Sequence, residues 1–98
     1  MALQDSDYRF SITILIDEEP VLYCLRGLSM YAQGEGNVYK PWKNAGREEW
    51  EHHHHVVTFH FSSPEYRRLF KANATELLSG RWQMVGDSDD NPLPPDDS

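Results

Sequence analysis

Hydrophobic and polar residues alternate along residues 8–17, which is the pattern of a strand with one buried face. The apolar face comprises Tyr8, Phe10, Ile12, Ile14 and Ile16, and the opposite face comprises Arg9, Ser11 and Thr13. Burial of three isoleucine side chains contributes several kcal/mol of transfer free energy. The pattern therefore predicts that this face lies in the core beneath a helix.

A second alternating stretch, residues 52–61, contains all five histidines. It predicts another strand, in which Val57, Phe59 and Phe61 share the core face. His60 falls on the opposite face with Val56 and Thr58. A short third strand is predicted over residues 81–85.

The strongest helix signal follows the histidine stretch. Ser62 and Glu65 have the spacing of a capping box, Pro64 stands near the first helical position, and Gly80 marks the end. The predicted inner stripe comprises Tyr66, Leu69, Phe70, Asn73, Ala74 and Leu77, and the predicted outward residues are Arg67, Arg68 and Lys71.

Residues 17–33 fit two structures. In the first, Asp17 caps a helix that extends to about Gln33, with Val21, Leu25, Leu28 and Ala32 on one face. In the second, residues 17–20 form a hairpin loop and residues 21–25 return as a strand. The helical pattern covers more residues, so we favour the helix.

The resulting order, β-α-β-α-β, predicts an α+β fold that is ferredoxin-like or related. We expect a small open sheet of three to four strands, with two helices packed on one face because crossovers are right-handed. The uncovered face or an edge strand would then be available for a homodimer or another partner.

The net charge of −7 is unevenly distributed along the 98 residues. Residues 87–98 hold five of the 16 acidic residues and no basic residue, whereas residues 1–86 hold nine basic and 11 acidic residues, a net of −2. This division predicts a disordered N-terminus at residues 1–7, one domain at residues 8–86 and an acidic disordered tail at residues 87–98.

Several functional classes are disfavoured by the sequence. It contains no apolar run of about 18 residues and no secretory signal, so we expect neither a membrane span nor secretion. The single cysteine, Cys24, cannot form an internal disulfide, and the chain is expected to be cytoplasmic. We expect Cys24 to be a buried apolar residue. No catalytic motif is present, so the protein is predicted not to be an enzyme.

The histidines raise the question of a metal, because imidazole is a common zinc ligand. On a strand, His52 and His54 would share one face, and His53 and His55 the other, about 6–7 Å apart. The four residues are therefore the candidate zinc site. A polar strand end that is rich in histidine but binds no metal is the favoured explanation, and we expect no tightly bound cofactor.

Residues 34–47 form a long predicted loop with interleaved aromatic and basic side chains: Tyr39, Lys40, Trp42 and Lys43. Together with the basic residues of the following helix, this loop could hold a single-stranded nucleic acid by stacking and phosphate contact. The negative charge of the chain opposes that function.

The sequence favours a protein-binding module, a regulator or inhibitor that docks on a basic partner surface. The candidate partner-binding residues are Tyr39, Lys40, Trp42, Lys43, Trp50, Asp87, Asp89 and Asp90. The acidic tail could also mask the basic helix of the protein itself.

Overall fold

The structure, a computed structural model, describes residues 7–33 and 45–92. Within these ranges the chain forms β1 (Phe10–Ile16), α1 (Glu19–Gln33), α2 (Arg47–His52), β2 (Val56–Phe61), α3 (Pro64–Leu77) and β3 (Trp82–Ser88). The α+β class is confirmed. The observed order of elements is β-α-α-β-α-β. It differs from the predicted order by the short helix α2, which the sequence did not predict.

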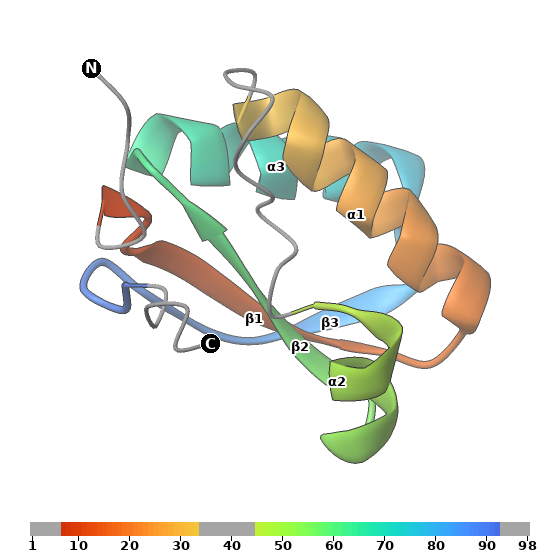
Figure 1. The fold of residues 1–98 in the computed structure, drawn as a ribbon. Coiled ribbons are helices and arrows are strands. Elements are labelled where there is room, and N and C mark those ends of the chain that lie inside the picture. The colour runs from red at the N-terminus through yellow and green to blue at the C-terminus, as the bar shows by residue number, and fades with distance from the viewer. Residues whose placement is uncertain (1–6, 34–44, 93–98) are drawn as a thin grey trace.

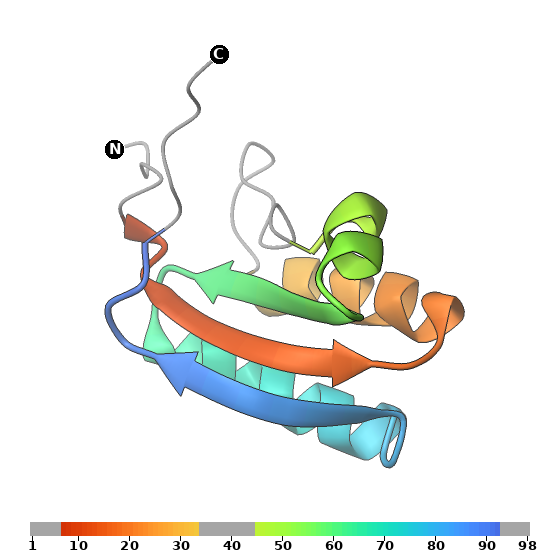
Figure 2. The ribbon, with the colours of Figure 1, turned by 90° about the horizontal axis from the view of Figure 1, so that it is seen from below.

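The three strands form an open sheet of order β2-β1-β3, and α1 and α3 lie on the same face of it (Figures 1 and 2). Both strand pairs are antiparallel, so the crossover argument was wrong for the connection from β1 to β2. The physical reason is α2. It brings the chain back to the end of the sheet where β1 finishes, and β2 therefore starts beside the end of β1.

The core lies between the sheet and α1 and α3. Ile12, Ile14 and Ile16 are at most 1% exposed, as the alternation of β1 predicted. From β2, Phe59 and Phe61 are fully buried and place their rings 4.9 and 5.3 Å from the ring of Phe70 on α3.

Helix α1 confirms the helical interpretation of residues 17–33 over the hairpin. Val21, Leu25 and Ala32 are buried on its inner side, and Leu28 is partly buried against the core.

Helix α3 begins one residue later than its predicted cap. Ser63, rather than Ser62, is the N-cap, and its hydroxyl accepts hydrogen bonds from the backbone N–H groups of Glu65 and Tyr66. The side chain of Ser62 instead accepts a hydrogen bond from Gln33 at the end of α1. A serine pair before a proline fits either register, and only the contact with α1 distinguishes the two.

The inner stripe of α3 is narrower than predicted. Phe70 and Ala74 are buried, but Leu69 and Leu77 are 42% and 66% exposed. Leu69 lies about 100° around the helix from Phe70. Leu77 falls on the side of Phe70 and Ala74, but it is the last helical residue and is exposed there. Gly80, with a φ of 79°, supports the reversal into β3.

The last strand is longer than predicted and extends into the presumed acidic tail. β3 pairs with β1 from Trp82 to Ser88, with one bulge that leaves Val85 without a partner opposite Thr13 and Ile14. The boundary predicted at residue 87 is therefore wrong. Backbone pairing to β1 offsets the polar composition of Asp87 and Ser88. Residues 1–6 and 93–98 lie outside the described residues.

Candidate functional site

The histidine strand predicted over the ten residues 52–61 is six residues long in the structure, from Val56 to Phe61. His52 ends α2, and His53, His54 and His55 form a turn before β2 starts at Val56. His54 and His55 have φ values of 57° and 69°, in the left-handed region. Alternation on an extended strand therefore does not describe these residues, and the strand argument that paired His52 with His54 and His53 with His55 does not apply.

The tight reversal at the histidine turn is stabilised by its contacts with Trp50. The backbone N–H of His55 donates to the carbonyl of Trp50 (2.8 Å), and the two aromatic rings stack with centroids 4.2 Å apart. The carbonyl of His55 accepts a hydrogen bond from the N–H of Ile16 (2.9 Å). These contacts offset the unfavourable backbone of two consecutive left-handed residues.

Trp50, which was predicted to be a partner-binding residue, is buried in the structure. Its side chain is 7% exposed, and its indole N–H donates to the carbonyl of Ile16 (2.7 Å). Through this bond α2 is fixed at the end of β1, beside the first turn of α1 (Figure 2).

This packing gathers carboxylates from two distant segments. We define the acidic end as Asp17, Glu18, Glu19, Glu48, Glu49 and Glu51, with the arginines Arg47 and Arg81 that contact them. Arg47 lies 3.0 Å from Glu19 and 2.9 Å from Glu51, so it joins α1 to α2. Arg81 contacts Glu18 at 2.9 Å. Six carboxylates against two arginines leave a net charge of −4 over these eight residues.

The carboxylates of the acidic end are accessible to solvent. Asp17 and Glu48 are exposed and form no ion pair with another described residue. The Glu49 carboxylate accepts a hydrogen bond from the N–H of Gly46 (2.9 Å), which stabilises the start of α2. The hydrogen bond and negative charge of Glu19 raise the pKa of the Tyr23 hydroxyl. The hydrogen bond from Arg47 to Glu51 raises the pKa of Arg47, and the negative charge of Glu19 raises it further.

An open depression of about 540 Å³ adjoins the acidic end. Its lining combines ionisable side chains with apolar ones: Glu49, His53, His54, Val56, Val57 and Thr58. Among the described residues there is no group of three or more His, Cys, Asp or Glu side chains that could hold a metal ion. The depression offers an apolar floor with a carboxylate at its edge.

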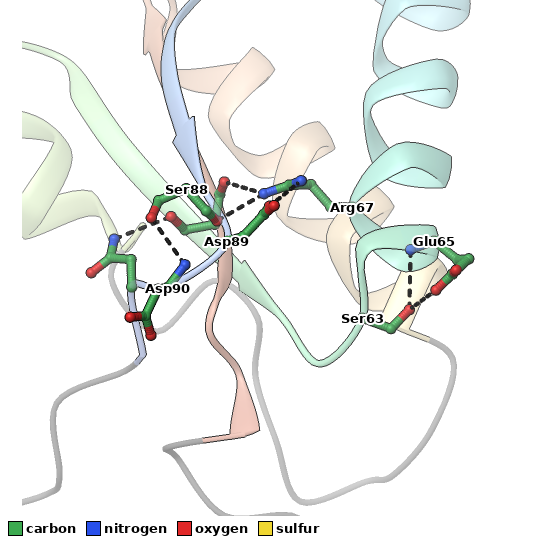
Figure 3. A network of polar contacts seen from close by, with 8 residues as sticks. Ser63, Glu65, Arg67, Ser88, Asp89 and Asp90 are labelled. Atoms are coloured by element: carbon green, nitrogen blue, oxygen red, sulfur yellow. Dashed lines mark hydrogen bonds and ion pairs between the residues drawn. The ribbon is translucent and has the colours of Figure 1, made fainter.

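The opposite end of the sheet uses its charges within the protein. Arg67 was predicted to point outward, but its side chain is only 17% exposed. Its guanidinium donates to the carbonyls of Ser11 (3.3 Å) and Ser88 (2.8 Å) and to the carboxylate of Asp89 (2.6 Å; Figure 3). The tail residue Asp89 thus covers a cation of the basic helix.

Residues 89–91 continue from β3 across the beginning of β1, and we call them the latch. The N–H of Asn91 donates to the carbonyl of Arg9 (2.8 Å), and its side-chain amide donates to the hydroxyl of Ser11 (3.1 Å). Asp90 lies 3.8 Å from Arg9. The carbonyl of Asn91 lies 2.9 Å from Nδ1 of His60, whose side chain is 1% exposed.

His60 is the one histidine of the five that is buried. Burial lowers its pKa, and hydrogen bonds to the backbone of Asn91 and Tyr8 partly oppose that effect. The alternation of side chains along β2 predicted that His60 lies on the sheet face opposite the core. It did not predict burial there, because the covering residues belong to the latch and to the segment before β1.

The remaining predicted site residues have varied positions. Tyr39, Lys40, Trp42 and Lys43 lie outside the described residues. Asp87 is exposed on β3, whereas Asp89 is paired with Arg67. Cys24 is exposed on α1, so the prediction that it is buried was wrong; it lies about 100° around the helix from the buried Leu25.

Sequence reasoning missed the acidic end, Arg67 and the latch. The acidic end had a partial signal, since Asp17-Glu18-Glu19 and Glu48-Glu49 are the two acidic runs of the body. Arg67 and Asn91 had none, because their partners lie 56 and 80 residues away in the sequence.

No protein-family model, curated protein or solved structure matches the chain. Across residues 7–33 and 45–92, no helix is sufficiently long and apolar to span a membrane.

Proposed function

We propose that the protein is a non-catalytic binding module whose acidic end docks on a basic protein segment. The observation that carries this proposal is the net charge of −4 on the acidic end, which a buried tryptophan assembles and the domain does not neutralise. This retains the basic partner expected from the sequence but assigns the contact to α1 and α2 instead of the C-terminal aspartates.

The depression beside the acidic end supports the chemical class of the partner. Lysine and arginine combine an aliphatic stem with a charged head, and such side chains cover apolar surface while the head stays near a carboxylate. Val56 supplies part-exposed apolar surface, and Glu49, whose carboxylate also accepts a hydrogen bond from Gly46, supplies the carboxylate. Exposed acidic groups also accelerate encounter with a basic surface, in a manner that salt suppresses.

Zinc and single-stranded nucleic acid have weaker support as ligands. The strand geometry behind the zinc prediction is replaced by a turn, and the loop of the nucleic-acid prediction lies outside the described residues. Of the three basic residues on α3, Arg67 is occupied by contacts within the protein. Neither ligand is favoured by a specific observation.

A matched pair of charge reversals tests the proposal. Glu48→Lys and Glu76→Lys each replace an exposed helical glutamate and change the net charge by two, but only Glu48 belongs to the acidic end. Proteins retained from a host lysate by the wild-type protein are identified, and the purified partner is titrated against each variant. Both variants should unfold at nearly the wild-type temperature, since both sites are on the surface.

We expect Glu48→Lys to slow association and flatten its salt dependence, and Glu76→Lys to change both much less. Equal effects of the two variants would show that net charge alone controls binding and would contradict the acidic end as the site. A partner whose retention neither variant alters would contradict the proposal altogether.

A further inference from the structure

His60 lies where the two terminal segments of the described domain meet. Its ring sits on the sheet face opposite α1 and α3, opposite Ser11 in the pairing of β1 with β2. Nδ1 lies 2.9 Å from the carbonyl of Asn91 in the latch, and the ring also hydrogen bonds with the backbone of Tyr8, before β1. A single imidazole thus contacts both segments.

The protonation state of His60 matters to both contacts. A neutral imidazole carries one N–H, so it can donate to one acceptor only, whereas the cation donates from both nitrogens. The site excludes water, because His60, Tyr8 and Ser11 are each at most 3% exposed. Placing a cation there costs solvation free energy that two neutral carbonyl groups do not fully restore.

We propose that the latch is a pH-sensitive device, in which protonation of His60 releases residues 89–91 from the sheet. In the closed form the ring is buried, and burial holds its pKa below the ordinary value. In the open form the ring is in water and titrates near about 6.5. The open form therefore binds the proton more tightly, and acidification through about pH 6.5 shifts the equilibrium toward it.

The charged groups around the latch do not reverse the lowering of the His60 pKa in the closed form. They are Asp7 and Arg9 on the N-terminal segment, Asp89 and Asp90 in the latch, and Arg67 on α3. None of them is among the causes of the shifted pKa of His60. Asp89 and Asp90 are 74% and 84% exposed, so solvent screens them from the buried ring.

Opening the latch has a specific consequence for Arg67. Release of residues 89–91 removes the Asp89 carboxylate from its guanidinium. The contact with the carbonyl of Ser88 belongs to β3 and is retained. Acidification would thus expose a cation on α3 that the closed form covers.

Amide hydrogen exchange at Asn91, measured by NMR between pH 5 and 7.5, tests the device. The Asn91 N–H donates to the carbonyl of Arg9 in the closed form, so its protection reports the closed population. After correction for intrinsic exchange, protection should fall by at most about tenfold per pH unit below pH 6.5. The amides of β1 should keep their protection, because the sheet stays folded.

Two variants separate the device from general acid effects. His60→Gln keeps an amide donor but cannot titrate, so its Asn91 protection should not depend on pH. His54→Gln removes a histidine of the exposed turn and should behave as the wild-type protein does. If His60→Gln does not fold, the wild-type protein still decides the question, because the ring resonances of His60 must titrate below about pH 6.5, in the range over which Asn91 protection falls.

Three results would overturn the proposal. One is Asn91 protection that does not change with pH in the wild-type protein. Another is an equal loss of protection in His60→Gln, which would implicate other groups. The third is a parallel loss at β1, which would indicate global unfolding.

Discussion

The two ends of β1 differ in how the protein uses charge. At the end near Ile16, six carboxylates meet two arginines, and the surplus faces solvent. At the end near Phe10, Arg67 and Arg9 each pair with an aspartate, and the guanidinium of Arg67 also bonds two backbone carbonyls. Both ends contain acidic residues. At the first end they outnumber the arginines that contact them, whereas at the second Asp89 and Asp90 each pair with an arginine.

The difference follows from what each arginine contacts. Arg47 bonds to exposed carboxylates and is itself 61% exposed, so water competes for each contact. Arg67 is 17% exposed and donates to the part-buried carbonyls of Ser11 and Ser88, as well as to the exposed carboxylate of Asp89. Ion pairs at the surface contribute little stability, whereas loss of a donor to buried acceptors is costly. The first end is thus suited to recognition and the second to stability.

The largest effect is expected at Trp50, which fixes α2 in place at the acidic end. Trp50→Ala removes a buried indole and its hydrogen bond to Ile16, and should lower the free energy of unfolding by about 3–5 kcal/mol. Trp50→Phe retains an aromatic ring but leaves the carbonyl unpaired, and should cost about 1–3 kcal/mol. Urea unfolding measures both; an unaffected midpoint in Trp50→Ala would contradict the assembly of the acidic end.

A smaller effect should separate the two arginines directly. Arg67→Met retains the aliphatic stem but removes three hydrogen bonds, and is expected to cost about 1–3 kcal/mol. Arg47→Met removes two exposed ion pairs and should leave the unfolding midpoint close to that of the wild-type protein. Equal losses in the two variants would remove the distinction between the ends.

Part of this comparison could be predicted from the sequence. The alternation in residues 8–17 predicted the buried isoleucines of β1 because burial of one strand face is a local property. The same argument assigned Phe59 and Phe61 correctly. The capping signal located α3 to within one residue, since Ser62 and Ser63 are chemically equivalent until Gln33 contacts one of them.

The rest depends on contacts between distant segments. Residues 52–55 resembled a strand, but the stacking of His55 on Trp50 favours a turn with left-handed residues. Arg67 resembled a solvated residue on a helix, and its acceptors come from β1, β3 and the latch. Asp89 and Asn91 belong to a polar, proline-rich stretch, and composition alone cannot show that Arg9, Ser11 and His60 hold it.

Burial of His60 makes the stability of the end of β1 near Phe10 depend on pH. The pKa of His60 is lowered in the folded protein, so the unfolded chain binds more protons between that pKa and about 6.5. The burial of neutral His60 therefore contributes its full stability above about pH 6.5. That contribution is lost as the pH falls from about 6.5 through the pKa of His60 in the folded protein. Thermal unfolding of the wild-type protein should therefore shift downward between pH 7.5 and 5.5 by more than that of His60→Gln. Identical shifts would contradict the burial of a neutral His60.

We expect the acidic end, rather than the C-terminal aspartates, to contact the partner. Glu48→Gln and Asp89→Asn each remove one negative charge, one from the acidic end and one from the contact with Arg67. The direct measurement is the association rate constant of the identified partner with each variant, at low and at physiological salt. If the acidic end contacts the partner, Glu48→Gln should associate more slowly and with a weaker salt dependence, and Asp89→Asn should change less. Slower association in Asp89→Asn, with Glu48→Gln indistinguishable from the wild-type protein, would contradict this expectation.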